Sequence, residues 1–392
     1  MTPPARTQAA IELLDAIIAA AREGGAAADT LVARYFATRR YAGSKDRRAV
    51  RELVYAAIRS AGELPGTGRA AMLSLADHDP ALAATFDGSA HGPAPMSDGE
   101  IRAEPGAAPA WLSALLQASD VDPATLIARG SLDLRVNRLK ADRETVLADV
   151  PDAQPTRYAP DGIRLPTGTN VDALSAYRDG LIEVQDEGSQ IVGLALDAQP
   201  GERIVDLCAG AGGKTLALAA AMSNKGVLLA CDTDRARLSR LAPRAERAGA
   251  TIIETRLLNP GREAEALADW NAAADGVLVD APCSGTGTWR RNPEARWRLT
   301  PARVDRLTET QRHVLEIAAP LVRPGGALVY IVCSLLEREG PDQIAAFLAA
   351  HRAWTAEPLT LPCGEPRGAG ARLTPALCGT DGFFVARLRR AC

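Results

Sequence analysis

The chain has no cysteine before Cys208 and no two cysteines in a CxxC spacing. Its seven cysteines are odd in number, and this pattern fits neither a disulfide framework nor a structural zinc site, so we expect reduced thiols and no bound metal. Aromatic residues make up only 4% of the sequence. Uninterrupted apolar runs of about 18 residues are also missing, so the sequence predicts no transmembrane helix.

The N-terminus lacks the basic, apolar and small-residue segments of a signal peptide, which favours a cytoplasmic protein. Neither sign of charge dominates, because the net charge is −3, and 47% of the residues are hydrophobic. These values describe an ordinary soluble protein and argue against an obligate binder of polyanions. A chain of 392 residues is long enough for two or three domains.

Charge is nevertheless distributed unevenly. Residues 1–60 carry ten Arg or Lys against six Asp or Glu. A second basic cluster is interleaved with tryptophans; it consists of Arg290, Arg291, Arg296 and Arg298 with Trp289 and Trp297. Basic groups beside aromatic rings suit a nucleic-acid backbone and a stacked base. The alternative is that the arginines are solvated and the tryptophans anchor a loop.

Apolar residues at helical spacing predict a small helical bundle over residues 1–75, which belongs to an all-α domain that extends with its linker to residue 127. Two helix faces show this spacing: Ile11, Leu14, Ile17 and Ile18, and Val50, Leu53, Val54 and Ile58. Ser44 is a suitable N-cap for the second helix. Residues 87–109 are rich in Gly, Pro, Ala and Ser and predict a linker, which a helix over residues 110–117 follows.

A change of pattern at residue 128 predicts a small α+β connector that extends to residue 180. Residues 132–137 alternate like a strand, and further short strands are expected around Ile163 and Ile182.

From Pro200 onward, apolar runs alternate with helical segments, which predicts a parallel sheet covered on both faces. This α/β domain spans residues 181–392. The expected strands are 203–208, 226–231, 251–255, 276–279, 327–332 and 382–388, and the expected helices are 214–222, 235–248 and 301–321.

A glycine-rich turn follows the first of these strands and has three possible roles. Its residues are Cys208, Ala209, Gly210, Ala211, Gly212, Gly213, Lys214 and Thr215. It can be a simple strand-to-helix connection. It can be part of a phosphate-binding loop, but Cys208 stands where that motif requires its first glycine. It can also be a nucleoside-cofactor site, where glycines allow close approach of the backbone.

Asp232 at the end of the second strand favours the third role, because an acidic side chain there can accept hydrogen bonds from both ribose hydroxyls. A solvated aspartate that caps the next helix is the alternative. Cys283 and Cys333 end the fourth and fifth strands. The carboxyl ends of neighbouring parallel strands meet, so both thiols are expected in one cleft beside the cofactor. There a thiolate can act as a nucleophile.

Six segments, in this order, resemble the RsmB/Nop/Sun family of RNA cytosine-C5 methyltransferases. They are residues 184–190 (VQDEGSQ), 208–215 (CAGAGGKT), 280–287 (DAPCSGTG), 291–294 (RNPE), 333–334 (CS) and 380–384 (TDGFF). The resemblance covers residues 132–390. It implies a Rossmann-like class I methyltransferase domain with a mostly parallel, doubly wound sheet. The first 75 residues look like the NusB-type helical domain of bacterial members that act on small-subunit ribosomal RNA.

The resemblance also implies roles for the site residues. Carbon 5 of cytosine is a poor nucleophile, so a thiolate must first add to carbon 6, and the family assigns this step to Cys333. Cys283 would assist release of the product. Asp280 would contact N3 and N4 of the base, where a shared proton can stabilise the adduct.

The cofactor implied is S-adenosyl-L-methionine, held by residues 208–214 and Asp280, with Asp232 on its ribose. The family usually has an aspartate near its adenine; the nearest residue here is Asn259, whose amide oxygen can still accept a hydrogen bond. RNA contacts are expected at Arg135, Asn137, Arg290 and Arg291.

The expected partner is RNA, with ribosomal RNA favoured, and the expected state is a monomer. Three alternatives stay open at this point: a transfer-RNA methyltransferase, a P-loop NTPase, and an inactive RNA-binding or ribosome-assembly factor on the same fold.

Overall fold

The computed structural model describes residues 1–392, which form two compact units. The helical unit comprises residues 1–129 and 288–301, and the sheet unit comprises residues 130–287 and 302–392. Residues 288–301 thus leave the sheet unit and join the helical one, although their position in the sequence predicted a place in the C-terminal domain. None of the helices has the length and apolar character that crossing a bilayer would demand.

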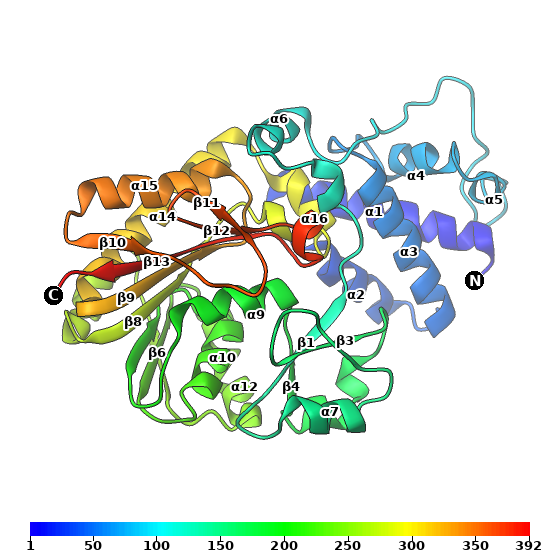
Figure 1. The fold of residues 1–392 in the computed structure, drawn as a ribbon. Coiled ribbons are helices and arrows are strands. Elements are labelled where there is room, and N and C mark those ends of the chain that lie inside the picture. The colour runs from blue at the N-terminus through cyan, green and yellow to red at the C-terminus, as the bar shows by residue number, and fades with distance from the viewer. The chain divides into compact units, whose positions relative to one another are not determined.

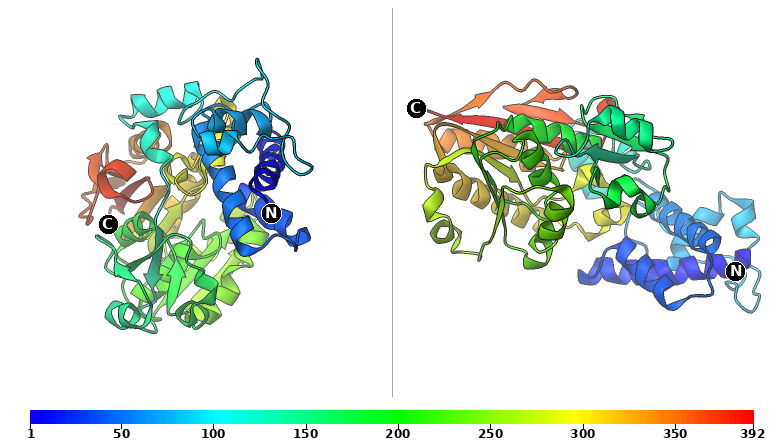
Figure 2. Two further views of the ribbon diagram at one scale, coloured as in Figure 1. Left: turned by 90° about the vertical axis from the view of Figure 1, so that its right-hand side faces the viewer. Right: turned by 90° about the horizontal axis from the view of Figure 1, so that it is seen from below.

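The helical unit contains the elements α1 (Pro3–Glu23), α2 (Ala28–Thr38), α3 (Ser44–Ser60), α4 (Gly68–Ala76), α5 (Pro80–Ala83), α6 (Ala110–Ala118), η1 (Pro123–Leu126) and η6 (Pro293–Arg298). The helix α1 packs against α3 and α4 (Figure 2). The faces predicted in α1 and α3 are buried, except that Leu53 is only partly buried. The N-cap predicted at Ser44 is wrong: Gly43 holds that position and Ser44 already has helical geometry, so its hydroxyl does not cap the helix.

Residues 288–301 complete the core of the helical unit. Trp297 is 5% exposed and packs among its apolar side chains. Arg296 is fully buried and donates to the carbonyl oxygens of Ile58 and Ala61, at 2.6 and 2.7 Å. Burial lowers the pKa of Arg296 to about 9. The tryptophan therefore anchors a loop, as the alternative interpretation held, but Arg296 is not solvated.

A four-stranded antiparallel sheet opens the sheet unit, in the order β2 (Gln154–Pro155), β3 (Gly162–Leu165), β1 (Leu132–Val136) and β4 (Ile182–Val184). Its helices are α7 (Arg143–Asp149), η2 (Val171–Ala173) and α8 (Ser175–Arg178). Because β4 pairs with β1, this sheet continues past residue 180, where the connector was expected to end.

The large sheet has nine strands in the order β11 (Glu365–Arg367), β12 (Gly370–Leu373), β13 (Phe383–Arg390), β9 (Val322–Val332), β8 (Ala274–Asp280), β5 (Arg203–Asp206), β6 (Val227–Asp232) and β7 (Ile253–Leu257), with β10 (Trp354–Glu357) also paired to β13. The five strands from β9 to β7 are parallel. The C-terminal strands pair antiparallel and extend this sheet beyond β9. The predicted α/β fold with a mostly parallel sheet is confirmed, and three short strands, β10 to β12, were not predicted.

The remaining elements are α9 (Glu187–Gly193), η3 (Leu194–Leu196), α10 (Gly213–Ala221), α11 (Arg235–Leu238), α12 (Leu241–Ala248), α13 (Glu263–Ala266), η4 (Ala268–Trp270), η5 (Thr286–Thr288), α14 (Pro301–Ala318), η7 (Ala319–Leu321), η8 (Glu337–Glu339), α15 (Pro341–Ala350) and α16 (Pro375–Cys378). A single helix was expected over 235–248. Two are found, because Pro243 has no amide hydrogen and its ring excludes a continuous helix through Ser239.

Helices cover both faces of the large sheet (Figure 1). Alternate strand residues point to opposite faces. Leu228 and Ala230 thus pack with α9, α10 and α12, whereas Leu229 and Cys231 lie in the core that α14 and α15 complete. This two-sided burial leaves the carboxyl ends of the parallel strands as the place where polar side chains gather.

One expectation about the cysteines is wrong. Cys363 and Cys378 form a disulfide across a 15-residue separation. Folding of β11, β12 and α16 brings their Cα atoms to 6.1 Å, which the linear spacing of the cysteines could not reveal. The other five cysteines are free.

Candidate active site

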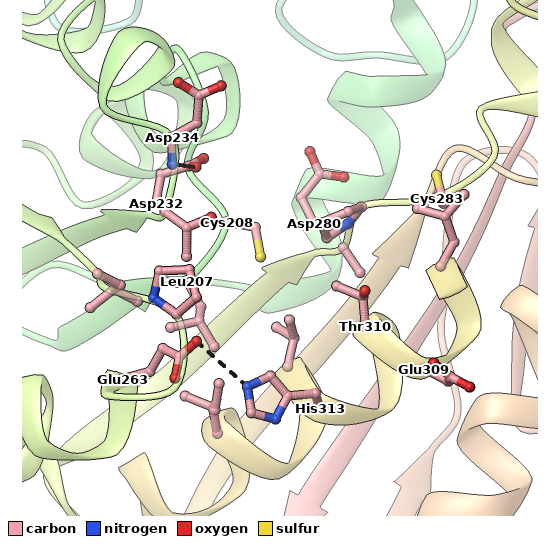
Figure 3. Close-up of a pocket in the computed structure, with 18 of the residues that line it drawn as sticks. Leu207, Cys208, Asp232, Asp234, Glu263, Asp280, Cys283, Glu309, Thr310 and His313 are labelled. Carbon is pink, nitrogen blue, oxygen red and sulfur yellow. Dashed lines mark hydrogen bonds and ion pairs between the residues drawn. The ribbon is translucent and has the colours of Figure 1, made fainter. Parts of the chain in front are cut away.

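A cavity of about 820 Å³ lies within the sheet unit at the carboxyl ends of the parallel strands. Its strand-end residues are Leu207 and Cys208 after β5, Asp232 at the end of β6, Leu258 after β7, Asp280 at the end of β8 and Cys333 after β9. In Figure 3, Cys208 lies between Asp232 and Asp280, as the order of β6, β5 and β8 requires. Residues of α14, among them Thr310 and His313, contribute another part of the lining.

Cys283 and Cys333 both line this cavity, and their Sγ atoms are 3.4 Å apart. The expectation that one cleft holds both thiols is confirmed. Both side chains are partly exposed. The hydrogen bond with Cys333 and burial raise the pKa of Cys283 well above its ordinary range. At neutral pH Cys283 therefore keeps its proton.

Asp280, which lines this cavity, forms an ion pair with Lys214. The Lys214 Nζ donates to Asp280 Oδ2 at 2.7 Å. Burial by itself lowers the pKa of Lys214, but the charge and hydrogen bond of Asp280 outweigh it, so the pKa is raised and the ammonium keeps its charge. Asp280 Oδ1 is left for a further hydrogen bond.

The glycine-rich turn adopts a geometry that other residues would disturb. Gly212 has φ of 89°, and a Cβ atom there would lie 2.1 Å from Leu241 Cδ1. Asp232 holds the turn, because one of its carboxylate oxygens accepts from the Gly210 amide at 2.7 Å. The cap of α11 is Asp234, so the alternative role proposed for Asp232 is wrong.

The residues that resembled a phosphate-binding loop are occupied by other contacts. Thr215 is fully buried and donates to Asp206 Oδ2 at 2.7 Å, while Lys214 is bound to Asp280. Burial raises the pKa of Asp206 to about 7. In an NTPase the lysine binds phosphate and the hydroxyl binds magnesium. Here both groups already have protein partners, which argues against an NTPase.

Asn259 is exposed and does not line the cavity, although its neighbours Leu258 and Pro260 do. An acidic residue that was not predicted, Glu263, lines this part of the cavity together with Leu258 and Pro260. Glu263 is 6% exposed, lines the cavity and pairs with His313, with 3.5 Å between Oε1 and Nε2 (Figure 3).

Two residues expected to contact RNA are buried in the sheet unit. Arg135 donates to Gln185 Oε1 at 2.7 Å, and burial lowers its pKa to about 10. Asn137 donates to the carbonyl oxygens of Gly180 and Ala248, at 2.9 and 2.7 Å. Both side chains are buried and make these hydrogen bonds inside the sheet unit, so the expectation that they face RNA is wrong.

Arg290 and Arg291 are partly exposed and stay candidates for RNA contact. The neighbouring Trp289 is fully buried, as Trp297 nearly is. Neither tryptophan ring is available to stack on a base, so that interpretation of the basic and aromatic cluster is wrong.

Three more residues at the site were missed: Gln311, Glu339 and His313. Gln311 and Glu339 are fully buried and contact the segments that carry the two cysteines. A glutamine in the middle of a helix and a glutamate in a charged turn have no distinguishing sequence pattern, so only the fold identifies them.

Comparison with known families gives a match to residues 193–389, about half of the chain, for the family described as 16S rRNA methyltransferase RsmB/F. A probable ribosomal RNA small subunit methyltransferase B from Synechocystis sp. is 38% identical over 274 residues, which is 67% of this chain and 60% of the relative. A relative of the same description from Bacillus subtilis is 34% identical, over 66% of this chain and 59% of its own length.

The chain therefore spans about 60% of the length of these curated relatives. Among solved structures, the crystal structure of PH0851 is similar over the full length of both chains, with a TM-score of 0.77 and 24% identity. This likeness supports the fold described above.

Proposed function

Because the chain belongs to the family of 16S rRNA methyltransferases RsmB/F, we propose that it transfers a methyl group from S-adenosylmethionine to carbon 5 of a cytosine in ribosomal RNA. The observation that carries the proposal is the pair of thiols, 3.4 Å apart, in a cavity that is also lined by Cys208, the first residue of the glycine-rich turn. Retention of both thiols, Lys214 and Asp280 argues against an inactive assembly factor. The names of the relatives favour ribosomal over transfer RNA.

The cavity suits the cofactor, which supplies the methyl group when bound. Residues 208–214 would hold its methionine part. Asp232 accepts from the amides of Gly210 and Asp234, and a carboxylate has about four acceptor sites, so two are left for the ribose hydroxyls. Near the adenine, Glu263 is the acceptor that Asn259 does not provide.

In the proposed reaction, the Cys333 thiolate adds to carbon 6 of the cytosine. Asp280, kept beside the Lys214 ammonium, contacts N3 and N4 of the base, where a shared proton spreads the developing charge. After carbon 5 has taken up the methyl group, its proton passes to water, the electron pair of that C–H bond re-forms the double bond between carbons 5 and 6, and Cys333 leaves carbon 6 as a thiolate. Cys283, whose raised pKa keeps it protonated, assists this last stage.

We assign RNA binding outside the cavity to the helical unit, in the manner of a NusB-type domain. The basic residues of α3, such as Lys45 and Arg48, are exposed and supply charge for phosphate contacts.

Bisulfite sequencing of RNA tests the function. Small-subunit ribosomal RNA from cells without this gene, incubated with the protein and S-adenosylmethionine, is expected to gain a protected cytosine. If neither ribosomal nor transfer RNA gains a protected cytosine, the proposal is wrong. If only transfer RNA gains one, the substrate is transfer RNA and not ribosomal RNA.

A prediction concerns the adenine. Glu263→Ala is expected to weaken binding of S-adenosylhomocysteine by about 10- to 100-fold, because a hydrogen bond to a charged acceptor contributes about 1.5–3 kcal/mol. Titration calorimetry measures this, with Asn259→Ala as the matched control, which should change the Kd less than about threefold. S-Inosylhomocysteine, which lacks the exocyclic amine, should bind the wild-type protein and Glu263→Ala with the same weak affinity. A large effect of Asn259→Ala with none for Glu263→Ala would return the contact to Asn259.

A further inference from the structure

Glu339 is a fully buried carboxylate behind the two thiols, and no step of the reaction above uses it. It ends the short turn η8, six residues after Cys333 in the sequence. A buried carboxylate requires hydrogen-bond donors, because an unpaired charge away from water is costly. Most of the hydrogen bonds that the Glu339 carboxylate accepts come from the segments that carry the thiols.

Residues on both cysteine segments donate to Glu339. From the Cys283 segment, the Ser284 amide donates to Oε1 at 2.8 Å, and the Ser284 hydroxyl donates to Oε2. From the Cys333 segment, the Ser334 hydroxyl donates to Oε2 at 2.5 Å. Each serine directly follows its cysteine. One carboxylate thus joins the ends of β8 and β9 at the positions next to the thiols.

Gln311 on α14 extends this network to the residue before Cys283. Its Nε2 donates to Glu339 Oε1 and to the Pro282 carbonyl oxygen, both at 2.9 Å. Cys283 is therefore held on both sides by groups that bind Glu339. The two serine hydroxyls are also 3.1 Å apart, so little freedom is left between the segments.

We propose that Glu339 is a positioning residue that fixes the separation and orientation of the Cys283 and Cys333 thiols. A glutamine at this position keeps the size of the side chain but removes its charge and replaces one acceptor oxygen by an NH2 donor. At the Oε1 position this NH2 group would face the Ser284 amide, which can only donate, and at the Oε2 position it would require both serine hydroxyls to reverse their hydrogen bonds. Either arrangement weakens the hydrogen bonds that hold the two segments together. The charge of Glu339 also adds to the hydrogen bond and burial that raise the pKa of Cys283.

The test compares three proteins: the wild-type protein, Glu339→Gln and Glu337→Gln. Glu337 lies on the same turn and pairs with Arg367, 2.9 Å away, so its substitution removes an equal charge outside the network. Because a displacement of about 1 Å at reacting groups can cost about 100-fold in rate, kcat of Glu339→Gln is expected to fall by about that factor. The Kd for S-adenosylhomocysteine should stay within about threefold, and Glu337→Gln should keep its kcat.

A second measurement needs no activity. Diamide oxidises the Cys283 and Cys333 thiols to a disulfide and takes up their two hydrogens. Peptide mass spectrometry measures the rate at which this disulfide forms. This rate is expected to fall about tenfold in Glu339→Gln and to stay unchanged in Glu337→Gln. The inference builds on the proposed function, but a failure of methylation in the wild-type protein would leave this measurement valid.

Unchanged kcat and unchanged disulfide formation in folded Glu339→Gln would overturn the inference. If that variant does not fold, Ser334→Ala removes one donor from the network and should slow disulfide formation by a smaller factor of about three. An unchanged rate in folded Ser334→Ala would then be the contradicting result.

Discussion

Replacement of Cys333 by alanine is expected to abolish methyl transfer, with a loss of about 10⁴-fold or more. Removal of a covalent nucleophile has effects of this size, because the remaining groups cannot form the intermediate. Transfer of tritiated methyl groups to small-subunit ribosomal RNA measures the effect. No covalent complex between protein and RNA should form at any time.

The structure offers a matched control for this experiment. Cys392 is free, exposed and outside the cavity, so Cys392→Ala removes a thiol without touching the site and should keep full activity. Cofactor binding by Cys333→Ala should stay within about threefold of the wild-type value, which would show that the cavity persists. Methylation by Cys333→Ala within tenfold of the wild-type rate would exclude Cys333 as the nucleophile.

Replacement of Cys283 by alanine is expected to increase the amount of covalent complex between protein and RNA, whereas Cys333→Ala prevents its formation. The addition to carbon 6 and the methyl transfer proceed, but release is impaired, because the protonated thiol 3.4 Å from Cys333 is gone. A complex of protein and methylated RNA should accumulate, and turnover after the first cycle should fall by about 10²- to 10³-fold, the size of a general acid–base contribution. Denaturing gels with labelled RNA detect the complex.

The double variant without both cysteines separates the two roles. It should form no complex, because release matters only after Cys333 has reacted. If Cys333→Ala accumulates the complex and Cys283→Ala does not, the assignments must be exchanged.

The cleft could be predicted from the sequence because it follows from sheet topology. Strands that alternate with helices are parallel, and their carboxyl ends meet, so residues at the ends of β5, β6, β8 and β9 had to converge. Asp232, Asp280 and the two thiols are such residues. Their positions depend on the order of the strands and not on the details of packing.

The failures concern burial and side-chain contacts. Arg135 and Asn137 were expected to contact RNA because of the family resemblance, but both side chains are buried and make their hydrogen bonds inside the sheet unit. The residue identities at 289–298 fit an RNA surface as well as they fit a loop that fills a core. Glu339 and Glu263 differ from exposed glutamates only in what the fold places around them.

The return of residues 288–301 to the helical unit has a consequence for synthesis on the ribosome. Trp297 and Arg296 fill positions among helices that were translated more than 230 residues earlier, as the contact between Arg296 and Ile58 illustrates. At about 5–20 residues per second, the interval between synthesis of Arg129 and synthesis of Trp297 lasts about 8 to 34 seconds. During this interval the apolar interior of the helical unit is incomplete, so a chaperone that binds nascent chains is expected to hold residues 1–129 until the tryptophan segment arrives.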